Sequence, residues 1–159
     1  MKFLVDRMLG KLAKTLRMLG YDTIYYQGND AYQMIQLARR EGRVILTRSA
    51  KLVPKSPEDR ILRVTEDKPF SQLRELVQKG YVSPEGENLL SRCLLCNALL
   101  DEILREDVEG KVPDFILYQQ KEFSRCPQCR RIYWQGTHEK NMRKKLDELL
   151  LVESREQRA

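Results

Sequence analysis

Short apolar runs alternate with helical stripes of apolar residues along the first 80 positions. The run Phe3-Leu4-Val5 ends on Asp6, and from residue 7 apolar side chains recur at steps of three and four. Such runs are typical of strands buried on both faces, and such steps are typical of amphipathic helices. The same alternation predicts strands over 2–5, 22–26, 43–46 and 61–64, helices over 7–19, 30–40 and 69–79, and a loop over 51–60. The order of these elements predicts an α/β fold with a mostly parallel sheet flanked by helices.

The pattern changes after residue 80. Residues 81–91 contain Pro84 and Gly86, show little periodicity and predict a linker. Beyond it the predicted elements are strands over 115–118 and 132–134, a helix over 138–152 and a frayed tail over 153–159. We therefore expect an α/β domain over 1–80 and a smaller module, with its C-terminal helix, over 92–152.

All four cysteines of the chain lie in two Cys-x-x-Cys pairs, separated by residues 97–125. This gap is longer than in most zinc fingers, but it has room for a hairpin. Each pair places two thiolates around a tight turn, so the two pairs predict a closed, structural Zn²⁺ site whose ligands are Cys93, Cys96, Cys126 and Cys129. Disulfides are the alternative, which an expected cytoplasmic location disfavours. A redox-active pair is disfavoured because neither pair follows a buried strand into a helix.

The composition of the chain indicates a class of partner only through its charge. The formal net charge is +6 and the sequence pI is about 9.2. Residues 1–90 carry 16 Lys and Arg against 11 Asp and Glu, whereas residues 91–159 carry 13 against 12. A basic front half favours an anionic partner, most commonly nucleic acid, although the charge could serve solubility alone. No stretch has the length of a membrane span or of a signal peptide, so we expect a cytoplasmic protein without a membrane partner.

Three carboxylates lie at or near the expected carboxyl edge of the sheet, where open α/β sheets bind ligands. Asp6 follows the first strand, Asp30 precedes the second helix, and Asp67 follows the fourth strand. Converging carboxylates of this kind bind Mg²⁺ or Mn²⁺, which activate water for attack at phosphorus. Taken singly, Asp6 and Asp30 are equally well explained as helix N-caps, and Asp67 as part of a turn.

Several motifs together resemble a PIN-like ribonuclease family, the "Mut-seven C-terminal" RNase domain family with a fused zinc ribbon. The resemblance covers nearly the whole chain and rests on 6–13, 16–22, 29–30, 42–48, 91–97 and 133–138. It implies a PIN-like sheet, a divalent-metal RNase site of clustered acids, a C-terminal zinc ribbon, and structured or single-stranded RNA as substrate. Asp6 then matches the first acid of the family pattern, and Asp30 matches the acid at the head of the second helix.

One motif position departs from this family. After the third strand the family pattern reads Leu-Thr-Arg-Asp, whereas this chain has Ser49 in place of the acid. A serine hydroxyl is a weak neutral ligand, and the loss of one negative charge is expected to weaken Mg²⁺ binding. Asp67 or Glu66 could supply a compensating ligand.

Basic side chains near the acids and behind the second cysteine pair are candidates for contact with RNA. Lys14 and Arg17 are expected to point away from the apolar stripe of their helix, and Arg17 and Arg48 also match family motifs. The predicted RNA-binding residues are Arg7, Lys11, Lys14, Arg17, Arg48, Arg130, Arg131 and His138. Tyr133 and Trp134 could stack on bases, but packing between the ribbon and the α/β layer is the favoured role for Trp134.

These features favour an RNA-binding endoribonuclease that depends on a divalent metal, forms no covalent intermediate, uses Asp6, Asp30 and Asp67, and is weakened by Ser49. The alternative is a catalytically inactive PIN-like adaptor that binds RNA or ribonucleoprotein, and Ser49 is its main support. A protein-interaction module is a third hypothesis, which the charge excess disfavours.

Overall fold

The computed structural model divides the chain into two compact units, Met1–Leu90 (unit 1) and Ser91–Ala159 (unit 2). It describes the backbone of residues 1–158 and the side chains of all of these except residues 138 and 149–158. Residues 81–90, which the sequence predicts to be a linker, belong to unit 1.

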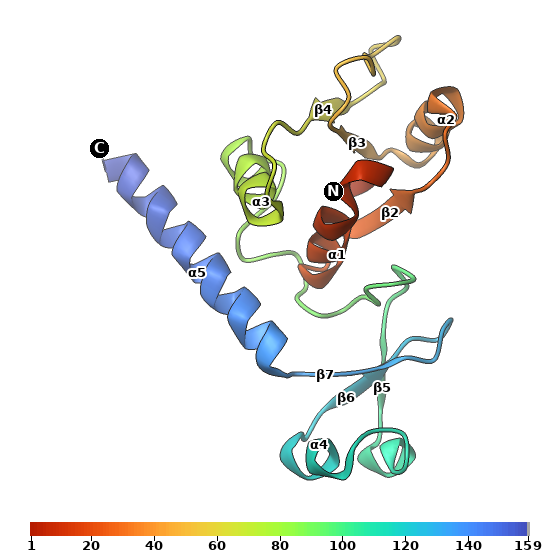
Figure 1. The fold of residues 1–159 in the computed structure, drawn as a ribbon, viewed down its shortest axis with the longest axis vertical. Helices are drawn as coiled ribbons and strands as arrows, with labels where there is room; N and C mark the ends of the chain where they lie inside the picture. Colours follow the sequence, from red (N-terminus) through yellow and green to blue (C-terminus); the bar gives the residue numbers. More distant parts are fainter. Residues whose placement is uncertain (159) are drawn as a thin grey trace. The chain divides into compact units, whose positions relative to one another are not determined.

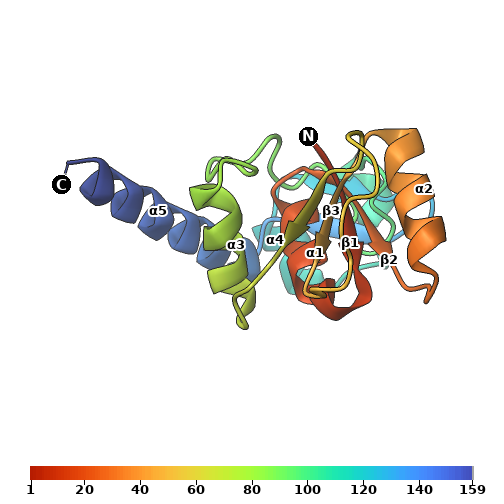
Figure 2. The same ribbon diagram turned by 90° about the horizontal axis from the view of Figure 1, so that it is seen from above.

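Unit 1 is built on a four-stranded parallel sheet in the order β2-β1-β3-β4 (Figures 1 and 2). Its elements are β1 (Lys2–Asp6), η1 (Arg7–Leu9), α1 (Gly10–Met18), β2 (Asp22–Tyr26), α2 (Ala31–Glu41), β3 (Val44–Thr47), β4 (Ile61–Arg63) and α3 (Pro69–Gln78). The predicted α/β fold with a parallel sheet flanked by helices is confirmed. Because all four strands run the same way, their carboxyl ends meet at one edge.

The central strand β1 is buried on both faces, as its apolar run predicts. Phe3, Leu4 and Val5 are each 0% exposed. Leu4 packs with Ile45 of β3 and with Met34 of α2 in one cluster. Successive side chains of a strand point to opposite faces, so Phe3 and Val5 belong to the face opposite α2. Figures 1 and 2 show α1 and α2 on opposite sides of the sheet.

Residues 81–90 are attached to the end of α1 by backbone hydrogen bonds. The N–H groups of Glu87 and Asn88 donate to the carbonyl of Leu19, at N···O distances of 2.9 and 3.3 Å. Gly20 makes this approach possible, because its φ is +93° and an added Cβ would lie 2.2 Å from the Asn88 carbonyl oxygen. The segment therefore belongs to the fold of unit 1, although its sequence has no helical or strand period.

Unit 2 contains a three-stranded antiparallel sheet in the order β5-β6-β7. Its elements are β5 (Asp101–Ile103), η2 (Arg105–Val108), α4 (Asp114–Gln119), β6 (Phe123–Arg125), β7 (Ile132–Trp134) and α5 (Thr137–Arg158). Buried Val108, Leu117 and Phe123 form its apolar cluster, and Trp134 packs against this cluster. Trp134 thus contributes to the core of unit 2 itself.

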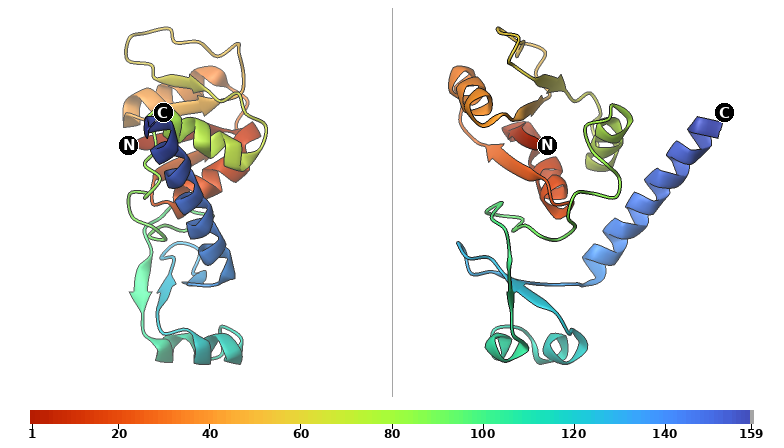
Figure 3. Two further views of the ribbon diagram at one scale, coloured as in Figure 1. Left: turned by 90° about the vertical axis from the view of Figure 1, so that its left-hand side faces the viewer. Right: turned by 180° about the vertical axis from the view of Figure 1, so that it is seen from behind.

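The strand predicted over 115–118 is wrong, because these residues lie in helix α4, which Figures 1 and 3 show at one end of the small sheet. Pro113 precedes the helix at its N-cap, and its fixed φ suits a helix start. Phe115 and Tyr118, three residues apart, are exposed, whereas Leu117 is buried. This spacing fits one turn of helix with an exposed and a buried side.

The C-terminal helix is longer than predicted. Helix α5 extends to Arg158, six residues past the predicted end at 152, and so includes most of the tail predicted to be frayed. Residue 159 lies outside the described residues. Among the helices that the structure describes, none is long and apolar enough to cross a membrane.

Candidate active site and cysteine cluster

Asp6 stands at the carboxyl end of the central strand, and both of its carboxylate oxygens have partners. Oδ2 accepts a hydrogen bond from Thr47 Oγ1 at 2.8 Å, and Oδ1 accepts a long one from the backbone N–H of Met8 at 3.4 Å. The second bond makes Asp6 the N-cap of η1. Asp6 is therefore both an N-cap and a residue at the carboxyl edge of the sheet, and its role in binding a ligand stays a prediction.

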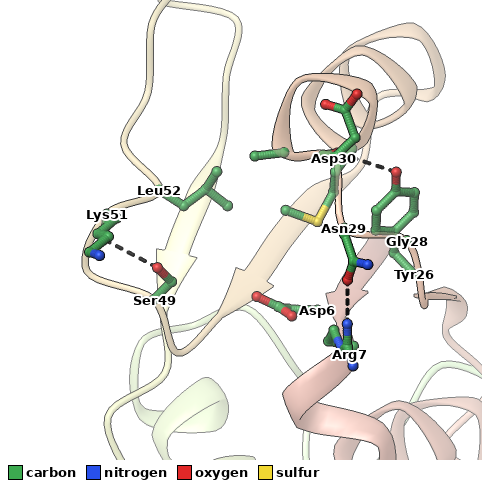
Figure 4. A pocket seen from close by; sticks show the side chains of 11 residues that line it. Asp6, Arg7, Tyr26, Gly28, Asn29, Asp30, Ser49, Lys51 and Leu52 are labelled. Atoms are coloured by element: carbon green, nitrogen blue, oxygen red, sulfur yellow. Dashed lines mark hydrogen bonds between the residues drawn. The ribbon is translucent and has the colours of Figure 1, made fainter.

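Asp30 is the N-cap of α2. Its Oδ1 accepts hydrogen bonds from the backbone N–H groups of Tyr32 and Gln33, at 2.9 and 3.2 Å. Its backbone carbonyl accepts the hydroxyl of Tyr26 at 3.2 Å. The side chain is exposed, and Figure 4 shows its carboxylate pointing away from Asp6.

One open pocket of about 250 Å³ is lined by both acids and by Ser49 (Figure 4). A water molecule takes up about 30 Å³ of liquid, so the pocket has room for a hydrated ion or a phosphate group. Its lining residues come from the ends of β1, β2 and β3 and from the start of α2: Asp6, Arg7, Tyr26, Gly28, Asn29, Asp30, Ala31, Met34, Ser49, Lys51 and Leu52. The charged side chains are thus two acids and two bases.

Ser49 and Thr47 tie the loop after β3 to Asp6. The N–H of Ser49 donates to Thr47 Oγ1 at 3.0 Å, which leaves the Thr47 hydroxyl proton to be donated to Asp6. The hydroxyl of Ser49 accepts the N–H of Lys51 at 3.2 Å. Thr47 is 0% exposed. It is a functional candidate that the sequence analysis missed, although its place in the Leu-Thr-Arg motif was a usable signal.

The third predicted acid lies elsewhere. Asp67 does not line the pocket; its Oδ1 accepts a hydrogen bond from Arg48 Nη2 at 2.7 Å, and its side chain is 89% exposed. Arg48 also donates to the backbone carbonyl of Glu66. Among the described side chains, the four cysteines are the only group of three or more His, Cys, Asp or Glu that could hold a metal ion. Neither Asp67 nor Glu66 lines the pocket that Ser49 borders.

The predicted basic residues have different surroundings. Arg7 lines the pocket and donates to Asn29 Oδ1. Arg17 is only 8% exposed, and its Nε donates to the carbonyl of Thr23 at 2.9 Å, so the prediction that it points away from the core is wrong. Arg17 lies in the last turn of α1, where it reaches the neighbouring strand β2. Four of the remaining candidates are exposed: Lys11, Lys14, Arg130 and Arg131. Arg48 is half-buried, and the side chain of His138 lies outside the described residues.

The separations of the sulfur atoms in the cysteine cluster fit a tetrahedral metal site. The four Sγ atoms all lie within 4.8 Å of one another, and no cysteine is in a disulfide. Cys93 Sγ and Cys129 Sγ are 3.7 Å apart, close to the edge of about 3.8 Å that a tetrahedron with Zn–S bonds of about 2.3 Å would have. The set fits structural zinc, because four protein sulfurs leave no open position.

Both cysteine pairs form the same backbone turn. The N–H of Asn97 donates to the carbonyl of Cys93, and the N–H of Arg130 donates to the carbonyl of Cys126, each at 3.0 Å. Asn97 and Arg130 both have left-handed φ, at +67° and +66°. Because the two turns have the same conformation, each of them directs its two sulfurs toward the centre of the cysteine cluster.

Tyr133, which the sequence analysis considered only as a residue that could stack on bases, lies beside the cysteine cluster. Its hydroxyl lies 3.1 Å from Cys93 Sγ. Burial raises the pKa of the Cys93 thiol, but hydrogen bonds from Tyr133 and from the backbone of Cys96 and Leu95 outweigh this effect and lower the pKa to about 6. The thiolate form, which is the form that binds metals, is therefore favoured at Cys93.

Comparison with known proteins identifies the family. A family model described as the Mut7-C RNAse domain matches residues 1–146. Comparisons with curated proteins and with solved structures gave no match. The match covers most of the 159 residues, and the chain belongs to the Mut7-C RNase domain family, as the motifs around Asp6 and the cysteines indicated.

Proposed function

We propose that this member of the Mut7-C RNase domain family binds RNA and hydrolyses it at the pocket beside Asp6, with a divalent metal ion that Ser49 leaves weakly held. The observation that carries the proposal is the position of Asp6, Asp30 and Ser49 around one pocket at the carboxyl edge of the sheet. An RNase domain is consistent with RNA as the ligand, and the excess of basic residues in 1–90 supports it.

The donor set of the pocket suits Mg²⁺ or Mn²⁺ in kind, because carboxylate and hydroxyl oxygens are their preferred ligands. Asp6 would hold the ion with the Ser49 hydroxyl as a neutral neighbour, and Asp30 would join as a second ligand once its carboxylate, which points away from Asp6 in Figure 4, turns toward the ion. When bound, such an ion activates water and stabilises charge that develops at phosphorus. The site has one negative charge fewer than the family pattern provides, which supports weak binding.

The chain's own residues have separate tasks in this proposal. Thr47 holds the Asp6 carboxylate in one orientation through the 2.8 Å hydrogen bond. Arg7 and Lys51 line the same pocket and would contact the phosphate of a bound strand. Exposed Lys11 and Lys14 on α1 extend the basic surface and would contact phosphates further along the strand.

The experiment is RNA cleavage by the full chain with Mn²⁺ or with chelator, comparing Asp6→Asn with Asp67→Asn. Asp67→Asn is the matched control, since it makes the same chemical change outside the pocket. We expect Asp6→Asn to lower the cleavage rate by about 100-fold or more, the scale of losing one positioned catalytic group, and Asp67→Asn to leave the rate unchanged. Equal effects of the two substitutions, or cleavage that persists in chelator, would overturn the proposal.

A second candidate function is RNA binding without cleavage. It is favoured by Ser49 and by the absence, among the described side chains, of a third carboxylate in the pocket. This function predicts RNA affinity that falls with salt but is the same in Mn²⁺ and in chelator, and no cleavage by any preparation. Metal-dependent cleavage that is lost in Asp6→Asn would exclude it.

A further inference from the structure

Tyr133 belongs to strand β7, and its hydroxyl contacts the first cysteine turn. Tyr133 is the middle residue of β7 and pairs with Ser124 of β6. Its Oη lies 3.1 Å from Cys93 Sγ and 3.1 Å from the backbone nitrogen of Leu94. The sheet of unit 2 therefore fixes a phenol against one of the four sulfurs.

The direction of these hydrogen bonds follows from the groups involved. The N–H of Leu94 can only donate, so the phenol oxygen accepts there. A zinc-bound cysteine is a thiolate, which can only accept. The phenol proton is therefore donated to Cys93 Sγ, and one hydroxyl joins the strand to the metal ligand and to the turn that follows it.

The contact between Tyr133 and Cys93 comes in addition to the contacts that the two cysteine turns share. Within each turn, the second cysteine's N–H approaches the first cysteine's sulfur: Cys96 N lies 3.4 Å from Cys93 Sγ, and Cys129 N lies 3.5 Å from Cys126 Sγ. Cys93 receives the phenol as well. Cys93 is 0% exposed, so water cannot supply that donor, and a buried thiolate that loses a hydrogen-bond donor is less well stabilised.

We propose that Tyr133 is a positioning residue of the cysteine site, whose hydroxyl orients the Cys93 thiolate and keeps zinc bound in unit 2. The role is separate from RNA hydrolysis, because it concerns the structural metal alone. Groups that hydrogen-bond to metal ligands fix ligand orientation, and their loss typically weakens metal affinity by about 10- to 100-fold.

The test is zinc transfer from the full chain to a chelating dye, comparing Tyr133→Phe with Tyr118→Phe. Both substitutions remove one hydroxyl and keep the ring, and Tyr118 is 78% exposed in the same unit. We expect Tyr133→Phe to weaken zinc affinity by about 10- to 100-fold and Tyr118→Phe to leave it unchanged. Equal affinities for wild type and Tyr133→Phe would overturn the proposal.

A second readout separates a hydrogen bond to sulfur from a loss of packing. In the Co²⁺-loaded protein, the thiolate-to-metal charge-transfer band reports electron density on the sulfurs. Loss of the phenol donor leaves Cys93 richer in electrons, so the band of Tyr133→Phe is expected at lower energy than that of wild type and Tyr118→Phe. A band at the same energy in all three proteins would mean that Tyr133 acts on the site through packing alone, which contradicts the proposal.

Discussion

At the scale of single residues, the two oxygens of the Asp6 carboxylate have different hydrogen-bond partners. These partners determine how much hydrogen-bonding and metal-binding capacity the carboxylate retains for a ligand. Oδ2 receives a short hydrogen bond from Thr47, whereas Oδ1 receives only a long one from Met8 at 3.4 Å. A carboxylate oxygen has two acceptor sites, so each oxygen retains capacity. Thr47 thus fixes the orientation of Asp6 while leaving it able to bind a cation.

Glu75, in contrast to Asp6, has a carboxylate with a structural role. Its oxygens accept from the N–H and hydroxyl of Thr65, from the N–H of Glu66 and from Lys79, and so join the end of β4 to α3. Burial raises the pKa of Glu75, but these hydrogen bonds outweigh burial and hold the pKa below its ordinary value of 4.5. A depressed folded-state pKa stabilises the fold above the unfolded pKa, and this stability is lost as pH falls through the folded value.

Glu75→Gln is therefore expected to destabilise unit 1 at neutral pH by about 1–3 kcal/mol, the cost of breaking buried hydrogen bonds to a charged group. The difference from wild type should shrink as pH falls below the ordinary pKa of 4.5, because the wild-type carboxylate is then lost too. Hydrogen exchange of the β1 amides measures unit 1 alone. Glu66→Gln, at an exposed side chain, serves as the control with an expected effect within about 0.5 kcal/mol. A Glu75→Gln effect of constant size between pH 7 and pH 3.5 would refute the assignment.

The sequence located Asp6 and Asp30 correctly near one edge of the sheet because both follow directly from the strand–helix order. It could not locate Asp67, whose partner Arg48 is 19 residues away in the chain. Arg17 was misassigned for a related reason. A helical stripe tells which positions face the core, but the long side chain of Arg17 reaches a carbonyl of β2 that periodicity does not reveal.

At the scale of elements, the attachment of residues 81–90 to α1 depends on glycine at position 20. An added Cβ there would lie 2.2 Å from the backbone oxygen of Asn88, a contact that a rotamer change cannot relieve. Gly80 also has positive φ, at +78°, but nothing lies within 4 Å of its would-be Cβ. Alanine substitutions at these two positions therefore distinguish the cost of backbone strain from the cost of a steric clash.

Gly20→Ala is expected to destabilise unit 1 more than Gly80→Ala does. Left-handed φ costs alanine about 1–2 kcal/mol at either site, and overpacking adds about 1–3 kcal/mol at Gly20 only. Hydrogen exchange of the β1 amides in the two variants gives the comparison. Equal destabilisation by the two substitutions would show that the close approach of residues 87–88 to α1 contributes nothing to stability.

Local pattern predicted the elements of unit 1 better than those of unit 2. In unit 1, long apolar runs and stripes distinguish strands from helices. In unit 2 the strands have three residues each, too few to show a period. The four apolar or aromatic residues 115–118 then read equally well as a strand or as one turn of helix, and Pro113 was the signal that favoured the helix.

At the scale of the whole molecule, the two units depend on different sources of stability. Unit 1 has a core of fully buried side chains on both faces of its sheet, whereas the apolar cluster of unit 2 has three buried residues. A small module whose described apolar cluster is of this size is stabilised by a further constraint such as a metal. The four sulfurs supply the ligands for one.

Removal of zinc with a strong chelator is therefore expected to unfold the β5-β6-β7 sheet while β1 and β3 stay protected. Amide hydrogen exchange with and without chelator measures both units in one sample. Protection of β6 amides should fall to the level of an unfolded chain, and protection of β1 amides should not change. Retained protection of β6 after zinc is removed would show that the metal is dispensable for the fold of unit 2.

The measurement that tests the proposed function most directly is the rate of RNA cleavage in Mn²⁺ by wild type, Ser49→Asp and the double variant Ser49→Asp with Asp6→Asn. The Ser49 hydroxyl accepts the N–H of Lys51, and an aspartate can accept the same bond, so the loop accommodates the change. We predict that Ser49→Asp cleaves about tenfold faster than wild type or more, because an added charged ligand strengthens metal binding, and that the double variant is inactive. A Ser49→Asp rate no higher than that of wild type, or activity that survives in the double variant, would contradict the account.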